Sequence, residues 1–177
     1  PELICDDIYN MPAPVEKFDL ILMRDVIEHI HEQERFMAFA RQFMHQNTLF
    51  FLAFPPWQNP FGGHQQVCRN RFLSALPYFH LLPASLYSAF LHLCGESRAT
   101  IDNLLEIKET GLSIDRFRKI IAGYRIVAEK FYLVNPNYEV KFGIKPVTQC
   151  GLISGIPCLR DLLSTSAYYV LTPEINS

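Results

Sequence analysis

The fold is organised around the stretch Phe18-Asp19-Leu20-Ile21-Leu22-Met23-Arg24-Asp25-Val26-Ile27-Glu28-His29. It begins with a short apolar run, becomes polar at Arg24-Asp25 and continues with a pattern typical of a helix. The run over residues 18–23, broken only by Asp19, has the length and composition of a buried parallel strand. Beyond it, Asp25, Glu28 and His29 follow at spacings of three and four, which would place them on one face of a helix. Because ligands of open α/β sheets bind outside the carboxyl ends of the strands, we expect the chemistry of this protein here.

The segments that follow this stretch alternate between helical and strand-like patterns. Apolar spacing predicts a helix from about Val26 that breaks near His31-Glu32 and a second helix over 33–45. Residues 49–54 are a second continuous apolar run, which Pro55-Pro56 ends. A strand, helices and another apolar strand predict an α/β fold with a parallel sheet covered by helices.

A long excursion, residues 58–111, interrupts this regular order. It begins with a turn-rich loop through Gly62-Gly63-His64 and continues with helical patterns near 83–93 and 99–108. About fifty residues are too many for an ordinary connection, which indicates a lid or a substrate-shaping element. A pair of helices that forms a dimer would explain the same apolar pattern equally well.

Regular patterns return after the excursion and complete a single domain, 1–177. Ser113 is a suitable N-cap for a helix over 114–122. A strand is predicted over 124–134, a helix over 156–163 and a last strand over 167–171. Two strands separated by a long C-terminal excursion predict an antiparallel pair that closes the sheet.

The composition predicts a globular protein and excludes several functional classes. Hydrophobic residues make up 49% of the chain, and the formal net charge is -2, so we expect a packed core and no nucleic-acid partner. The five cysteines are scattered without a Cys-x-x-Cys pair, which predicts reduced thiols and a cytoplasmic location. Prolines and polar residues interrupt the longest apolar region, so we expect no membrane span.

Three motifs in one order resemble the class I S-adenosylmethionine-dependent methyltransferases of the type 11/12 group. They are Asp7-Ile8-Tyr9-Asn10-Met11-Pro12, Phe18-Asp19-Leu20-Ile21-Leu22 and Asp25-Val26-Ile27-Glu28-His29, and Gly123-Tyr124 resembles the family's glycine-aromatic start of the sixth strand. The resemblance implies a Rossmann-like fold whose complete sheet has seven strands in the order 3-2-1-4-5-7-6. Strands three to seven would be present here, with residues 58–111 inserted after strand five.

The chain departs from the family pattern because it lacks the family's glycine-rich loop after the first strand, which approaches the methionine part of the cofactor. No Gly-x-Gly occurs in the sequence, and the acidic residue that ends the family's second strand has no counterpart. We therefore expect an N-terminally truncated domain with a gap in its sheet between the Asp7 strand and the Phe18 strand. Such a fragment would bind S-adenosylmethionine poorly and would be inactive without its N-terminal part.

The resemblance also implies roles for cofactor-binding residues. Asp7 would accept a hydrogen bond from the adenine amino group, and Ile8 would donate its backbone N–H to the ring. Met23 and Arg24, with Asp25 beside them, would line the methionine part of the cofactor. The alternative for Asp7 is that its carboxylate caps a turn.

Asp25, Glu28 and His29 allow three interpretations. An acid with a glutamate three residues later is typical of a capping box, which satisfies helix amides. Two carboxylates and an imidazole also suit a divalent cation such as Mg²⁺, Mn²⁺, Fe²⁺ or Zn²⁺, and two methyltransferase subgroups use this pattern with a later histidine, here His64. In the third interpretation His29 or His64 is the catalytic general base.

The sequence thus predicts a methyltransferase that modifies a small-molecule or lipid-like acceptor, with O-methylation favoured. The first alternative is a non-catalytic methyltransferase-like module that uses its apolar insertion for partner or homodimer contacts. The second is a dinucleotide oxidoreductase of related topology, which the positions of Asp7 and Glu28-His29 disfavour.

Overall fold

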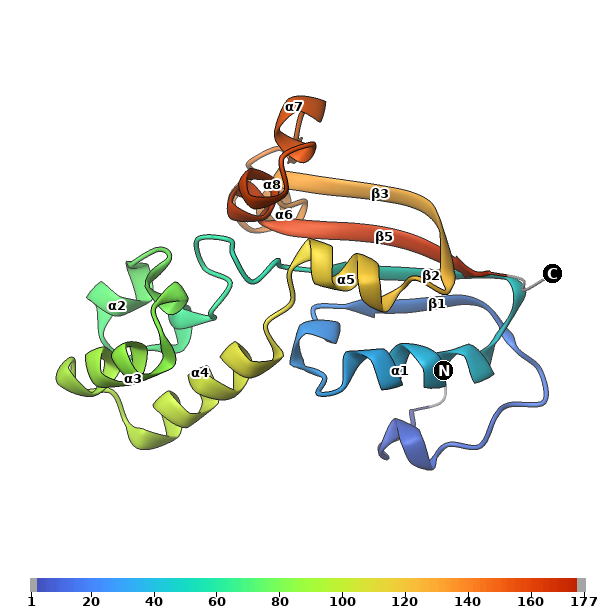
Figure 1. Ribbon diagram of the computed structural model, residues 1–177, viewed down its shortest axis with the longest axis horizontal. Helices are drawn as coiled ribbons and strands as arrows, with labels where there is room; N and C mark the ends of the chain where they lie inside the picture. Colours follow the sequence, from blue (N-terminus) through green and yellow to red (C-terminus); the bar gives the residue numbers. More distant parts are fainter. Residues whose placement is uncertain (1–2, 175–177) are drawn as a thin grey trace.

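A computed structural model describes residues 3–174, and one mixed sheet runs through it (Figure 1). The strands are β1 (Phe18–Arg24), β2 (Met44–Phe54), β3 (Tyr124–Val134), β4 (Val147–Thr148) and β5 (Ser166–Pro173), in the spatial order β1-β2-β5-β3-β4. β1 and β2 are parallel, whereas β5 is antiparallel to both β2 and β3. The predicted α/β class and the predicted closing antiparallel pair are therefore confirmed.

The connection between β1 and β2 is more broken than the sequence indicated. After β1 comes a single 3-10 turn, η2 (Ile27–His29), and the helix α1 (Gln33–Ala40) begins only after Glu32, whose φ of 52° is left-handed. The predicted break at His31-Glu32 is confirmed, but the predicted helix from Val26 is wrong. α1 is followed by η3 (Arg41–Phe43), and β2 begins at Met44 rather than at Leu49 because Met44 already pairs with Phe18.

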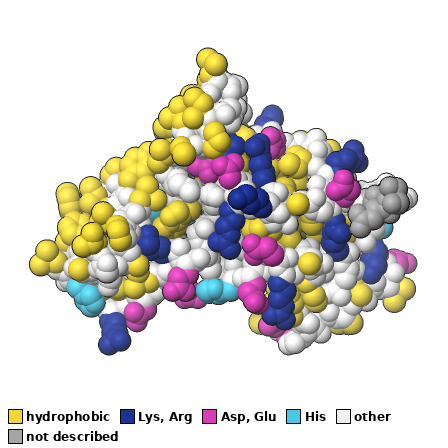
Figure 2. Space-filling view, viewed as in Figure 1, with side chains coloured by type: hydrophobic (Ala, Val, Ile, Leu, Met, Phe, Trp, Pro, Cys, Tyr) yellow, Lys and Arg dark blue, Asp and Glu magenta, His cyan; other side chains and the backbone are white. Residues whose placement is uncertain are grey.

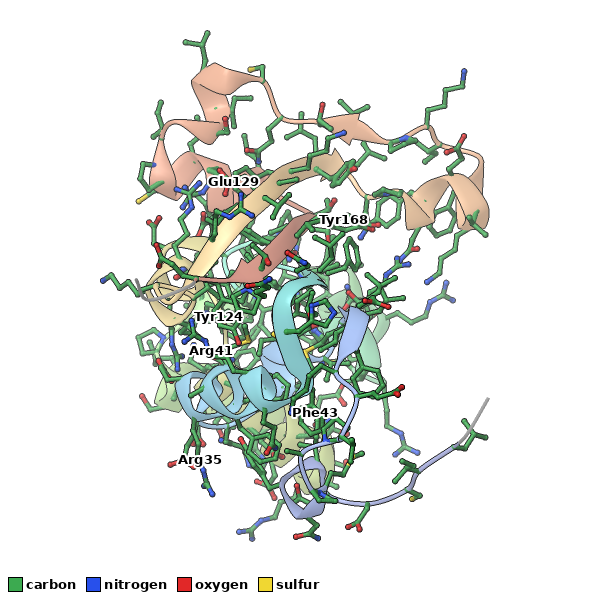
Figure 3. The ribbon with its side chains drawn as sticks, turned by 90° about the vertical axis from the view of Figure 1, so that its right-hand side faces the viewer. Arg35, Arg41, Phe43, Tyr124, Glu129 and Tyr168 are labelled. Atoms are coloured by element: carbon green, nitrogen blue, oxygen red, sulfur yellow. The ribbon has the colours of Figure 1, made fainter. Side chains whose placement is uncertain are left out.

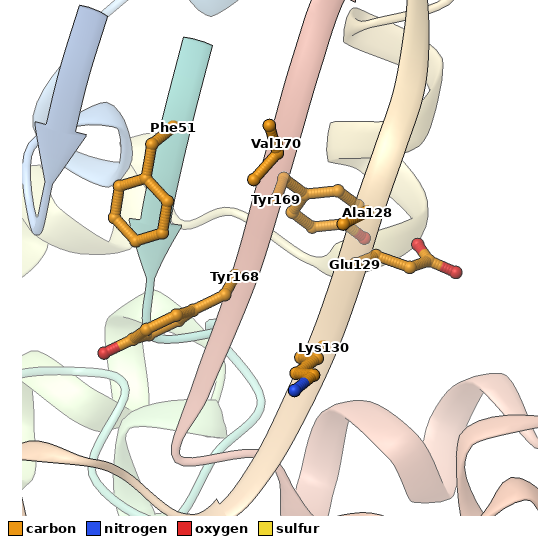
Figure 4. A pocket seen from close by; sticks show the side chains of 7 residues that line it. All are labelled: Phe51, Ala128, Glu129, Lys130, Tyr168, Tyr169 and Val170. Atoms are coloured by element: carbon orange, nitrogen blue, oxygen red, sulfur yellow. The ribbon is translucent and has the colours of Figure 1, made fainter. Parts of the chain in front are cut away.

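Helices cover one face of this sheet and leave much of the other open. α1 and α5 (Ile114–Ile120) share one buried core with β2, β3 and β5, and Ser113 caps α5 by accepting the Arg116 amide. On the opposite face Leu20 is 55% exposed and Leu22 68% exposed. Figure 4 shows the same face further along the sheet, where the rings of Phe51 and Tyr168 meet edge to face 5.4 Å apart beside a shallow hollow of about 170 Å³.

The N-terminal segment does not join the sheet. Residues 3–5 form no strand, and η1 (Ile8–Asn10) lies below α1 in Figure 1, where the Tyr9 ring packs 4.7 Å from Phe39. The expected third family strand is therefore absent from the described residues, and the expected gap inside the sheet is replaced by a free outer edge of β1. A strand needs a neighbour for its amides and carbonyls, and this segment packs on a helix instead.

The excursion after β2 builds a second, helical core beyond the end of the sheet (Figure 1). It contains η4 (Gln65–Val67), α2 (Arg71–Ala75), η5 (Phe79–Leu81), α3 (Ala84–Leu93) and α4 (Arg98–Thr110). Leu73, Tyr87, Leu91 and Leu104 are fully buried there. The Gln33 side chain donates to the carbonyls of Ile27 and Thr110, which fastens α4 to the turn that follows β1.

A second excursion separates β3 from β5 and carries α6 (Asn137–Phe142), β4, α7 (Gly151–Ser154) and α8 (Pro157–Leu163). Arg160 of α8 is buried and bonds the carboxylates of Asp115 at 2.6 Å and Asp161 at 2.9 Å. Asp161 in turn accepts the amide of Ile114 at the start of α5. This charged cluster joins α8 to the helix that covers the sheet.

Tyr124, the first residue of β3, packs against the end of α1 and the residues that follow it, and Figure 3 shows Tyr124 beside Arg41. The Tyr124 hydroxyl donates to the Met37 carbonyl of α1 at 2.6 Å, and the Arg41 guanidinium lies 4.8 Å from the centre of the tyrosine ring. A Cβ at Gly123 would lie 2.7 Å from the Arg41 guanidinium, so a larger residue there would displace the end of the Arg41 side chain from its place on the Tyr124 ring. Among the helices that the structure describes, none has the length and apolar character to cross a bilayer.

Candidate functional site

The site lies where the parallel strands β1 and β2 end side by side. Arg24 pairs with Ala53 in the ladder, and the Asp25 amide continues it by donating to the Ala53 carbonyl at 2.8 Å. Asp25 then takes a left-handed φ of 53°, a conformation that aspartate tolerates better than most residues. This turn directs the chain away from the strand and brings Asp25 and Glu28 to the wall of one pocket.

Glu28 is a buried acid with no hydrogen-bond partner among the residues that the structure describes. It is 4% exposed, and neither carboxyl oxygen accepts a hydrogen bond from a described residue. Burial, with a smaller contribution from the Asp25 carboxylate, raises the pKa of Glu28 to about 8. Buried polar groups are normally paired, so a protonated acid or a bound ligand is needed here.

The loop after β2 carries His64 to the same place. His64 adopts a left-handed φ of 54°, and its ring lies edge to face with His29, with centroids 4.9 Å apart. Burial and the neighbouring His29 lower the pKa of His64, whereas Asp25 opposes this shift. The His64 ring is therefore neutral near pH 7 and able to accept a proton or to bind a metal.

Two glycines and a second histidine hold this loop in shape. A Cβ at Gly62 would lie 2.3 Å from the Trp57 carbonyl oxygen, and a Cβ at Gly63 would lie 2.3 Å from the His80 side chain. His80 is fully buried, and its Nε2 is 2.8 Å from the Trp57 carbonyl. Burial lowers the pKa of His80 to about 4, so the ring is neutral and donates this hydrogen bond.

Three of the four predicted metal-ligating residues come together. Ligand atoms of Glu28, His29 and His64 all lie within 4.8 Å of one another. Asp25 lines the same pocket but is outside this group, and it bonds weakly with Arg24 at 3.5 Å instead. The donor set of one carboxylate and two imidazoles fits a divalent transition metal or zinc, whose catalytic sites use such ligands.

The capping-box interpretation of Asp25 and Glu28 is wrong. The residue that precedes η2 is Val26, and no side chain caps this turn. The expected placement of Asp25, Glu28 and His29 on one helix face is wrong as well, because the segment forms a single 3-10 turn. The left-handed Asp25 and Glu32 bound a stretch too short for an α-helix.

The pocket has a volume of about 560 Å³, and its far wall comes from residues that the sequence did not single out. Asn135, Asn137, Tyr138 and Lys141 reach it from the end of β3 and from α6. Their only sequence signal is the position of Asn135-Pro136-Asn137 just after a strand end. Because β2 and β3 are both antiparallel to β5, their carboxyl ends lie at the same edge of the sheet, which places Asn135 at the pocket that Asp25, Glu28 and His64 line.

The predicted cofactor-binding residues are divided between two places. Ile8 and Met23 line an apolar cavity of about 230 Å³ between η1, β1 and α1, whereas Asp25 faces the polar pocket. Arg24 is exposed at the end of β1. The Asp7 carboxylate accepts the Tyr9 amide at 3.0 Å, so it caps its own turn as the alternative predicted. Its contact with adenine stays a prediction.

The apolar cavity fits one end of S-adenosylmethionine. Aliphatic walls from Ile8, Met11 and Met23 suit the faces of a purine ring, and they follow directly after the Asp7 carboxylate. No Gly-x-Gly turn follows the strands β1 and β2 in the described residues. The residues that line this cavity have the apolar character that suits the adenine end of the cofactor.

A parallel pair of strands closed by antiparallel ones, with a polar pocket at the carboxyl ends, is compatible with a Rossmann-like, ligand-binding α/β protein. Residues 1–52 match the family model described as a methyltransferase domain. Over this segment, less than a third of the chain, the protein is similar to a class I S-adenosylmethionine-dependent methyltransferase domain. No curated protein matches the chain. Asp7, Asp25, Glu28 and His29 lie inside the matched segment, and His64 lies outside it.

Proposed function

We propose that this chain provides the acceptor side of a methyltransferase that uses S-adenosylmethionine to methylate a hydroxyl group of a small-molecule or lipid-like acceptor. The family match over residues 1–52 supports methyl transfer. The observation that carries the proposal is the convergence of Glu28, His29 and His64, of which Glu28 and His64 line the polar pocket. These groups suit the removal of a proton from an acceptor.

His64 is the general base in this proposal. Its lowered pKa keeps a ring nitrogen free to accept the hydroxyl proton near neutral pH. His29, whose ring meets His64 edge to face, positions it. S-adenosylmethionine supplies a methyl group already activated by its sulfonium, so the protein contributes mainly alignment and deprotonation.

The polar wall opposite His64 would orient the acceptor. Asn135 and Asn137 offer amide donors and acceptors, and Lys141 offers a cation that stabilises a developing oxyanion. Phe61 and Pro60 form an apolar part of the same pocket. A hydroxyl compound with one polar and one apolar side matches these walls.

A divalent cation bound by Glu28, His29 and His64 is a second candidate for the same step. The buried Glu28 carboxyl has no hydrogen-bond partner among the described residues, and a cation would supply one. When bound, it would lower the pKa of a coordinated acceptor hydroxyl, and His64 would then act as a ligand instead of a base. These two roles of His64 exclude each other and separate the two candidates.

Calorimetry tests the proposal. S-adenosylhomocysteine is titrated into the protein in the full length that its gene encodes, and the heat of binding is measured. We expect binding that Ile8→Asp weakens and that Val15→Asp leaves unchanged, because Ile8 lines the apolar cavity and Val15 is fully exposed. His64→Gln should retain this binding while lowering methyl transfer by about 100-fold or more, the usual contribution of a general base. Absence of binding at millimolar S-adenosylhomocysteine would favour the non-catalytic module.

A further inference from the structure

The outer side of the helical excursion exposes large apolar side chains in a row. Leu82 precedes α3, and Leu86 and Leu93 follow on the same side of this helix at a spacing of seven residues. Leu86 is 58% and Leu93 84% exposed, and Phe72 of α2 is 63% exposed. Figure 2 shows hydrophobic side chains gathered over this end of the molecule. We call Phe72, Leu82, Leu86 and Leu93 the α3 surface.

Two arginines border the α3 surface. The Asn70 side chain donates to the Cys94 carbonyl, and the Glu96 carboxylate accepts the amides of Arg69 and Asn70. These contacts hold Arg69 and Arg71 beside the C-terminal end of α3, where Leu93 is exposed. Both arginine side chains are exposed, and neither forms an ion pair with a described residue.

The chain around these arginines is poor in acidic residues. No aspartate or glutamate occurs from residue 36 to residue 95. Glu96 is buried with its carboxylate turned toward the two amides, and Asp102 of α4 faces Arg98 at 3.9 Å. The α3 surface is therefore apolar and is bordered by two arginines whose side chains form no ion pair with a described residue.

We propose that the α3 surface binds the interface of an anionic lipid bilayer. Leucine and phenylalanine side chains enter the boundary between headgroups and acyl chains, and arginines meet the phosphates of acidic lipids. A second copy of the chain fits the α3 surface less well than an anionic bilayer does. An isologous contact would bring Arg69 and Arg71 of both copies together without an acid to neutralise them.

The α3 surface is mechanically connected to the candidate site. An apolar groove of about 530 Å³, lined by Pro77, Leu82 and Phe90 among others, begins beside Leu82. Tyr78 in this groove donates its amide to the Pro60 carbonyl and its hydroxyl to the Leu162 carbonyl. Because Pro60 also lines the polar pocket, docking at the α3 surface would hold that pocket near the bilayer.

The test is flotation of the protein with vesicles of phosphatidylglycerol and phosphatidylcholine, compared with vesicles of phosphatidylcholine alone. We expect binding to the anionic vesicles that falls with added salt. Arg69→Glu combined with Arg71→Glu should lower the partition coefficient by about 25-fold or more, since each basic residue near an anionic surface contributes roughly fivefold. Leu86→Ser combined with Leu93→Ser should lower it to a similar extent, because buried apolar area also determines binding.

Two controls lie away from the α3 surface. Arg125→Glu removes an exposed arginine of β3, and Val15→Ser removes an exposed valine of the N-terminal loop. Both variants should float with the anionic vesicles to the same extent as the unchanged protein. Equal flotation of the Arg69/Arg71 variant, or no flotation with anionic vesicles, would overturn the proposal. A dimer in solution that the leucine substitutions dissociate, without vesicle binding, would assign the surface to a second copy instead. Vesicle flotation does not depend on methyl transfer, so failure of the membrane proposal can be distinguished from failure of the proposed function.

Discussion

His29 and His64 meet edge to face with ring centroids 4.9 Å apart, although one follows β1 and the other follows the next strand of the sheet, β2. Glu28 completes the group, with its Oε1 4.0 Å from the Nε2 of His29. The parallel pairing of β1 and β2 is what brings the two loops to the same edge. The consequences of this arrangement can be measured separately.

Cobalt binding distinguishes the two roles of the histidine pair. If the group holds a cation, Co²⁺ added to the protein should give a visible absorption band, and Glu28→Ala and His64→Ala should each weaken binding by at least about 100-fold, since even outer-shell partners of metal ligands contribute 10–100-fold. Asp25→Ala is the matched control, because Asp25 lines the pocket but lies outside the group of three. A band that survives both alanine substitutions, or no band at all, would leave His64 as the base.

The buried acid should make stability depend on pH. The pKa of Glu28 rises from an ordinary 4.5 to about 8 on folding, so the folded state retains a proton that the unfolded state has lost. This group therefore reduces the free energy of unfolding as the pH rises from about 4.5 to about 8, by at most about 5 kcal/mol at 1.36 kcal/mol per unit. Glu28→Gln should abolish most of this dependence.

The measurement is urea unfolding at about pH 5 and about pH 8, and the compared quantity is the difference between the two free energies of unfolding. Because each protein is compared with itself at the two pH values, any pH-independent effect of the buried glutamine on the free energy of unfolding cancels. Glu109→Gln alters an exposed acid without an ion pair among the described residues and should behave as the unchanged protein. If the two variants show the same pH dependence, Glu28 is already ionised in the folded protein.

Gly63 should be intolerant of any side chain. A Cβ there would lie 2.3 Å from His80, which is fully buried against Trp57. Gly63→Ala should therefore cost about 1–3 kcal/mol through overpacking and should also displace the neighbouring His64. Gly151→Ala is the control, because nothing lies within 4 Å of a Cβ at that position. Thermal unfolding of both variants checks this, and an equal melting temperature would contradict the close approach at Gly63.

The ion cluster at Arg160 should be important for attaching α8. Arg160→Leu leaves the buried Asp161 carboxylate without its guanidinium, and we expect a loss of about 3–5 kcal/mol, as for other broken buried pairs. Arg98→Leu removes an exposed arginine 3.9 Å from Asp102 and should cost about 1 kcal/mol at most. Urea unfolding compares the two variants. If the two variants lose similar amounts of unfolding free energy, the ion pairs of Arg160 are as accessible to solvent as the exposed pair of Arg98.

Local patterns were sufficient for most of the fold. The apolar runs before Arg24 and before Pro55 predicted both parallel strands, and Ser113 predicted the start of α5. The expected burial of the first strand is wrong, because β1 lies at the edge of the sheet with most of its side chains exposed. The break at His31-Glu32 was also foreseen from spacing. The helix expected from Val26 failed because Asp25 and Glu32 adopt left-handed conformations, which the identity of an aspartate or glutamate does not reveal.

The candidate site was predicted in part. Glu28, His29 and His64 were named from their positions after strand ends, and the structure brings them together. Asp25 was assigned to the same group but is turned aside beside Arg24. His80 and Asn135 were overlooked, because a buried donor to Trp57 and a pocket wall from β3 depend on contacts between segments distant in the chain.

The sequence by itself determined most of the strands and helices and the polar residues that follow the parallel strands, because each depends on neighbours within a few positions. The tertiary structure alone decided the burial of Glu28, the approach of His64 to His29 and the free edge of β1. Burial and proximity arise from which segments pack together, and it is burial that raises the pKa of Glu28. An exposed glutamate in the same motif would be an ordinary ionised acid.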